Sequence, residues 1–113
     1  MNEMESRKKI VLIIPSDIVA RGFESILSGQ GDFLVLDNLV DYSKPMEVRL
    51  RILDPDVVIV DPAVFDFRSR KDGRLLISEQ CDATVLALEG PAVTEDILRQ
   101  YDGLSRCTMT PQE

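Results

Sequence analysis

The chain has 113 residues, 44% of them hydrophobic and 29% charged, which is enough for one domain with a real core and too little for two. Its formal net charge is −7, so this domain by itself is poorly suited to bind a phosphate backbone. It contains no histidine. That absence excludes a Ser-His-Asp or Cys-His active site, a histidine metal centre and a phosphohistidine donor.

The cysteines and the apolar runs point to an ordinary intracellular chain. Cys81 and Cys107 have no CxxC spacing, so we expect two reduced, partly buried thiols. No apolar run approaches the length of a membrane span, and residues 1–9 lack the apolar centre of a secretory signal. We therefore expect a cytoplasmic protein with no membrane partner.

The first predicted elements are a strand over residues 10–14 and the helix that follows it. The strand is the apolar run IVLII, and Ser16 or Asp17 is suited to cap the helix. Gly29 ends the helix, and Gly22 inside it is expected to allow close packing on a sheet. The helix residues expected on the buried face are Ile18, Val19, Phe23, Ile26 and Leu27.

The middle of the chain predicts a strand, a helix and another strand. The run FLVL at 33–36 breaks into polar residues, so we expect it nearer an edge of the sheet. The helix begins near Pro45, which suits a first turn, and Pro55 prevents its continuation. The next strand, VVIV at 57–60, leads into Asp61. The helix residues expected to face the core are Met46, Leu50 and Leu53.

The last part of the chain predicts two more helices and two more strands. A weakly patterned helix is expected within residues 66–80, followed by the strand TVLAL at 84–88. Thr94 is suited to cap the next helix, with Val93 and Leu98 at the spacing of a hydrophobic contact around the cap. The final strand is expected to run from Leu104 to Met109.

These elements alternate as β-α-β-α-β-α-β-α-β, with intervals of helix length between the strands. Right-handed crossovers then make the chain a three-layer α/β domain with a parallel sheet. The continuous apolar runs fit strands that are buried on both faces. Such sheets place functional groups at the carboxyl ends of their strands, where this sequence has Pro15, Asp61 and Glu89.

Nucleotide-binding motifs are absent from the sequence. The first strand is followed by PSDIVARG, with a single glycine, and a G-x-G-x-x-G motif does not occur. There is also no G-x-x-x-x-G-K-[ST] motif. The small basic groups RKK at 7–9 and RSRK at 68–71 fit solvated loops better than a binding patch.

Two segments resemble a known family. RGFESIL at 21–27 and PDVVIVD at 55–61 are similar to signatures of the CheY-like receiver domain of bacterial two-component response regulators. The similarity is greatest to receivers that precede a LuxR/NarL-type helix-turn-helix domain, and it covers essentially the whole chain up to the fifth strand. It implies a flavodoxin-like fold with a five-stranded parallel sheet in the order 2-1-3-4-5.

The resemblance also implies a site. Asp61 occupies the position of the aspartate that the family phosphorylates from the phosphohistidine of a kinase. The family holds Mg²⁺ with two acidic residues after the first strand, because the carboxylate and the phosphoryl oxygens are all negative. Ile14 and Pro15 stand at those two positions and offer no side-chain oxygen.

Other positions of the implied site also depart from the family. Glu89 replaces the Ser or Thr that would bond the phosphate after the fourth strand. Arg106 or Cys107 stands where the family has lysine at the end of the fifth strand. The two tyrosines, Tyr42 and Tyr101, both fall outside the predicted fifth strand, which therefore has no aromatic residue. We therefore expect a degenerate receiver, or pseudo-receiver, that binds no cofactor.

The leading interpretation of residues 1–113 is a receiver-like regulatory domain that is not an enzyme. It would act by protein–protein contact, as a homodimer, and Asp61 would cap a loop or pair with Arg106. DNA would be bound only by an output domain absent from these residues. TPQE ends the chain where the family's fifth helix would begin, so we expect residues 1–113 to be the N-terminal fragment of a longer regulator. A natural stand-alone chain without that helix would leave part of one sheet face uncovered, which would favour association with a partner.

Two alternatives stay open. An authentic phosphoacceptor receiver would be phosphorylated on Asp61 by a sensor histidine kinase, with Mg²⁺ held by Asp17, Asp61 and Glu89. A small flavodoxin-like enzyme or ligand-binding domain would use the same strand-end crevice. This second alternative is the weaker one, because the sequence has no glycine-rich phosphate loop and no nucleophile–base pair.

Overall fold

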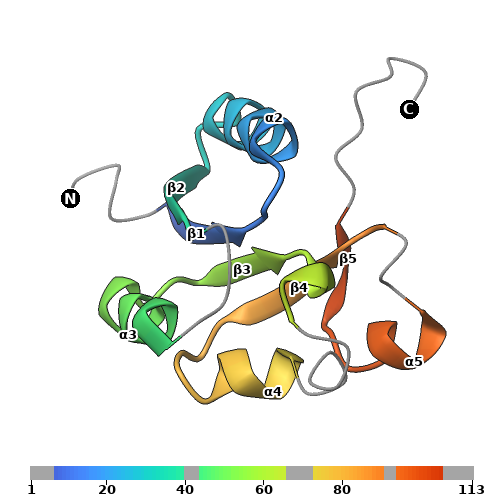
Figure 1. Ribbon diagram of the computed structural model, residues 1–113. Coiled ribbons are helices and arrows are strands. Elements are labelled where there is room, and N and C mark those ends of the chain that lie inside the picture. Colours follow the sequence, from blue (N-terminus) through green and yellow to red (C-terminus); the bar gives the residue numbers. More distant parts are fainter. Residues whose placement is uncertain (1–6, 40–43, 66–72, 91–93, 106–113) are drawn as a thin grey trace.

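A five-stranded parallel sheet forms the centre of the computed structural model (Figure 1). The structure describes residues 7–39, 44–65, 73–90 and 94–105. The strand order is β2-β1-β3-β4-β5, which confirms the predicted α/β class, parallel sheet and topology. The strands are β1 (Lys8–Ile13), β2 (Phe33–Asn38), β3 (Val57–Val60), β4 (Thr84–Leu88) and β5 (Gly103–Ser105). The helices are α2 (Asp17–Ser28), α3 (Lys44–Leu53), α4 (Gly73–Ser78) and α5 (Glu95–Leu98), with a 3-10 turn η1 (Pro62–Val64).

Helices pack on both faces of the sheet, which makes the domain three-layered (Figure 1). On one face α3, α4 and α5 contribute Leu50, Ile77 and Ile97 to a core formed with alternate residues of β1, β3 and β4. On the other face α2 contributes Ala20 and Phe23 to a second core. Successive strand residues point to opposite faces, so two covered faces require apolar residues at every position. This explains why the strand sequences are continuous apolar runs.

Helix α2 has the predicted ends but not the predicted buried face. The Ser16 hydroxyl accepts a hydrogen bond from the Val19 N–H (3.4 Å) and caps the helix, which ends before Gly29. The prediction that Ile18 and Ile26 lie on the buried face is wrong, because their side chains are 83% and 42% exposed. Ile18 precedes the buried Phe23 by five residues, which places it about 140° around the helix at 3.6 residues per turn.

Helix α3 follows its prediction closely. Leu50 is fully buried, and Met46 and Leu53 pack against the same core. The helix ends at Leu53, and Asp54 adopts a left-handed backbone (φ 45°) directly before Pro55. This conformation stops the helix, because a residue before proline is disfavoured in the right-handed helical region and aspartate tolerates the left-handed one.

The C-terminal part is confirmed where the structure describes it. Thr94 caps α5 by accepting a hydrogen bond from the Ile97 N–H (3.4 Å), as predicted. Helix α4 lies within the predicted 66–80, and β5 begins at Gly103, one residue before the predicted strand. Predictions for Val93 and for residues 106–109 fall outside the described residues. No helix in the described part of the chain is long and apolar enough to cross a membrane.

Candidate functional site

The carboxyl ends of β1, β3 and β4 meet at one edge of the sheet. In the parallel register Ile13 lies beside Val60, and Val60 lies beside Ala87. The Asp61 N–H donates to the Ile13 carbonyl oxygen (3.0 Å), which extends the pairing one residue past β3. The residues that follow these strands, Ile14, Pro15, Asp61 and Glu89, are called the strand-end site below.

Asp61 is the half-buried carboxylate of the strand-end site. Its Oδ1 accepts a hydrogen bond from the Ala63 N–H (3.0 Å), so the side chain caps the 3-10 turn η1. Pro62, which is buried, begins this turn and suits its backbone. Asp61 Oδ2 makes no hydrogen bond or ion pair with another described residue. The predicted loop-capping role is therefore observed, and one carboxylate oxygen stays available.

Ile14 occupies the end of β1 with its side chain fully buried. It belongs to the same core cluster as Ala20 and Phe23 of α2. Its N–H donates to Asn38 Oδ1 (3.0 Å), and its carbonyl accepts from Asn38 Nδ2 (3.1 Å). A side-chain amide thus replaces the next rung of the β1–β2 ladder. Ile14 and the exposed Pro15 do not fit the Mg²⁺ ligands that the resemblance implies.

Sequence reasoning missed the role of Asn38. The available signal was its place at the last residue of β2, just beyond the apolar run FLVL and Asp37, where a polar side chain can reach the backbone of a neighbouring strand end. Its own N–H donates to Asp37 Oδ1 (2.8 Å), and Asp37 Oδ2 contacts Arg49 Nη2 on α3 (2.6 Å). The Asp37–Asn38 pair therefore holds the end of β1 on one side and α3 on the other.

The other predicted acidic residues lie on the surface. Asp17 pairs with Arg21 one helical turn later (3.1 Å), with both side chains about three-quarters exposed. Glu89 is exposed just after β4. Across the described residues no group of three or more Asp, Glu or Cys side chains could hold a metal ion, so Asp17, Asp61 and Glu89 do not form one. Arg106 lies outside these residues.

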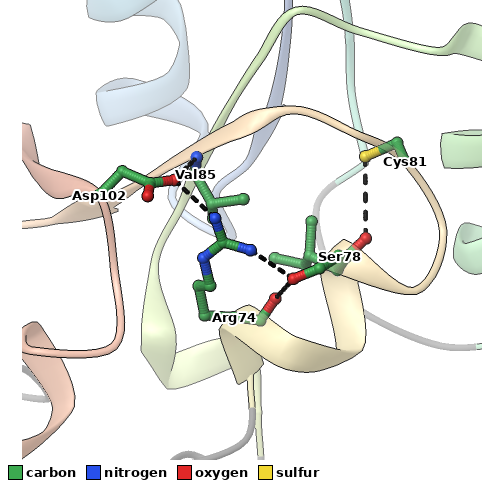
Figure 2. Close-up of polar contacts among 6 residues, drawn as sticks. Arg74, Ser78, Cys81, Val85 and Asp102 are labelled. Carbon is green, nitrogen blue, oxygen red and sulfur yellow. Dashed lines mark hydrogen bonds and ion pairs between the residues drawn. The ribbon is translucent and has the colours of Figure 1, made fainter.

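A second polar cluster, which the sequence did not predict, joins α4 to β4 and β5 (Figure 2). Arg74 Nη2 contacts Asp102 Oδ2 (2.9 Å), and the same oxygen accepts from the Val85 N–H (2.7 Å). Arg74 also donates to the Ser78 hydroxyl, which donates in turn to the Arg74 carbonyl oxygen (2.7 Å). Asp102 and Arg74 are only partly exposed, so this ion pair is better protected than the surface pairs on α2 and α5.

Two buried ionisable groups lie near that cluster. Burial raises the pKa of Tyr101 to about 12, and its hydroxyl has no hydrogen-bond partner among the described residues. Burial also raises the pKa of the Cys81 thiol, which donates weakly to the Ile77 carbonyl oxygen (3.8 Å). Both groups are neutral near pH 7, so neither offers a nucleophile. Cys81 is the predicted reduced thiol, and Cys107 lies outside the described residues.

A bare backbone at Gly73 allows the packing around Tyr101. A Cβ atom at Gly73 would lie 2.6 Å from Phe65 Cδ2 and 2.8 Å from the Tyr101 hydroxyl oxygen. Real Cβ atoms essentially never approach other atoms this closely, so a larger residue at the start of α4 would force the Phe65 or Tyr101 side chain to shift. Phe65 is the residue that ends η1, so the end of the turn capped by Asp61 lies beside the start of α4.

Comparison with known proteins finds similarity in three dimensions only. No family model matches the chain, and no curated protein matches it significantly. One similar solved structure is a fusion protein that carries a trimeric coiled coil from yeast, with 22% identity and a TM-score of 0.69. The match covers 94% of this chain and 71% of that one.

A second similar structure comes from Carboxydothermus hydrogenoformans. It is the N-terminal domain of a response regulator/sensory box/GGDEF three-domain protein, with 22% identity and a TM-score of 0.64. The match covers 93% of this chain and 86% of that one. At this identity the likeness establishes the fold. The chain is a flavodoxin-like α/β domain with the receiver topology, as the two sequence signatures predicted.

Proposed function

We propose that residues 1–113 form the receiver-like regulatory domain of a bacterial DNA-binding response regulator of the LuxR/NarL type. The domain is cytoplasmic and non-catalytic, and it controls a transcriptional output domain through protein–protein contact, including dimerisation. The regulatory role is supported by the fold, which is shared with a domain of a response-regulator protein. DNA binding belongs to the output domain, because this domain carries a net charge of −7.

The observation that carries the proposal is the state of the β1 end. At the position implied for a metal-binding carboxylate, Ile14 is fully buried, and both of its backbone polar groups are bonded to Asn38. Transfer of a phosphoryl group to Asp61 would bring negative phosphoryl oxygens up to a negative carboxylate, and without a cation that charge is not offset. We therefore propose that Asp61 is not phosphorylated in the ordinary Mg²⁺-dependent way.

Incubation with acetyl phosphate or beryllofluoride in the presence of Mg²⁺ tests this proposal. The expected result is an unchanged intact mass and an unchanged oligomeric state by light scattering. Asp61→Asn and a metal-free sample serve as controls. A Mg²⁺-dependent mass increase of one phosphoryl group that is lost in Asp61→Asn would overturn the non-phosphorylated assignment. A concentration-independent monomer would overturn the dimerisation.

A second candidate function is an authentic phosphoacceptor receiver served by a sensor histidine kinase. The observation that favours it is Asp61 itself, which stands half-buried at the strand end with Oδ2 unbonded among the described residues. Titration with Mg²⁺ or Mn²⁺ while following backbone amide signals separates the two candidates. Saturable shifts that cluster at Asp17, Asp61 and Glu89 would favour this candidate, and their absence would favour the first.

A further inference from the structure

We draw no further inference here: the strongest candidate, the exposed apolar pair of Val48 and Ile52 on the side of helix α3 that faces away from the core, carries none, because nothing in the described part of the structure shows what covers it.

Discussion

The strand-end site and the α4–β5 region use polar side chains in opposite ways. At the strand ends Asn38 and Asp61 bond exposed or half-buried backbone groups, and none of the described strand-end side chains is a buried polar group without a partner. In the α4–β5 region Arg74 and Asp102 satisfy the Val85 N–H, yet the nearby Tyr101 hydroxyl is buried without a partner. The strand-end site, which resembles an active site, thus has no buried side chain left unpaired among its described residues. The α4–β5 region, which the sequence did not predict, has one in the Tyr101 hydroxyl.

This difference teaches that the position of an aspartate does not by itself make a chemical site. The resemblance assigns Asp61 the place of a phosphoacceptor, but Ile14, the residue that follows the neighbouring strand β1, belongs to the core. Groups with perturbed pKa values often mark functional sites, and among the described residues these groups are Tyr101 and Cys81, which lie near the α4–β5 cluster and away from the strand-end site. Their shifts come first from burial, which is a structural cause.

The largest expected effect tests whether the β1 end is truly core. Ile14→Asp would lose apolar burial and place a carboxyl group in a fully buried position, so we expect the free energy of unfolding to fall by about 3–5 kcal/mol. Urea unfolding followed by circular dichroism measures it. Ile18→Asp, at an 83% exposed position of α2, is the matched control and should cost less than about 0.5 kcal/mol. Equal effects of the two variants would place Ile14 outside the core.

The next effect probes the defect in the α4–β5 region. The Tyr101 pKa is about 12 in the folded chain against an ordinary value of 10.0. The unfolded chain therefore releases this proton first, so stability is complete below pH 10 and falls as the pH rises toward 12. We expect a loss of about 2–3 kcal/mol over this interval, measured as the shift of urea unfolding with pH.

Tyr101→Phe isolates this contribution from other groups that titrate at high pH. The variant should lack the additional loss above pH 10, and at pH 7 it should be as stable as wild type or more so, because it removes an unsatisfied hydroxyl. Parallel pH profiles of the variant and wild type would show that the hydroxyl is solvated, and the contrast between the two regions would then disappear.

The sheet was predictable because the continuous apolar runs of β1, β3 and β4 reflect burial on both faces, a condition that each strand reports locally. The helix ends were predictable for the same reason, since Ser16 and Thr94 act within one turn of themselves. The exposed Ile18 was not, because apolar identity alone does not specify which side of α2 meets the sheet.

The polar contacts of the strand-end site and of the α4–β5 region could not be predicted from the sequence pattern. Asn38 bonds Ile14 across 24 positions, and Arg74 bonds Asp102 across 28. Such pairs are set by which strand ends become neighbours, and no local spacing encodes them. The resemblance did identify Asp61 and the departures at Ile14 and Pro15, since these follow from strand ends that the apolar runs define.

A smaller effect sharpens the account of Asn38. Asn38→Ala removes both hydrogen bonds to the Ile14 backbone and leaves that N–H and carbonyl partly buried, so we expect a loss of about 1–3 kcal/mol in urea unfolding. Asp37→Ala is the matched control on the same strand. It removes a partly exposed ion pair with Arg49 and the hydrogen bond that Asp37 Oδ1 accepts from the Asn38 N–H, but neither bond to Ile14, and should cost at most about 1 kcal/mol. If Asp37→Ala proved the costlier change, the surface pair and not the amide would hold the β1 end.

The smallest effect concerns the charge of Asp61. Asp61→Asn keeps an Oδ1 acceptor for the Ala63 N–H, so the cap survives, and we expect stability within about 0.5 kcal/mol of wild type. Asp61→Ala loses the cap of η1 and should cost about 0.5–2 kcal/mol. The comparison of the two variants in urea separates the oxygen that the fold uses from the charge that it does not.

The opposite result for the two Asp61 variants would point to an ion pair. If Asp61→Asn cost as much as Asp61→Ala, the carboxylate would be paired with a cation in solution, and the predicted partner is Arg106. A double-mutant cycle of Asp61→Asn with Arg106→Gln would then show a coupling energy above about 0.5 kcal/mol. If the cycle shows no coupling and Asp61→Asn leaves stability unchanged, the negative charge of Asp61 does not stabilise the fold. A binding partner or a modification would then be the remaining role for that charge.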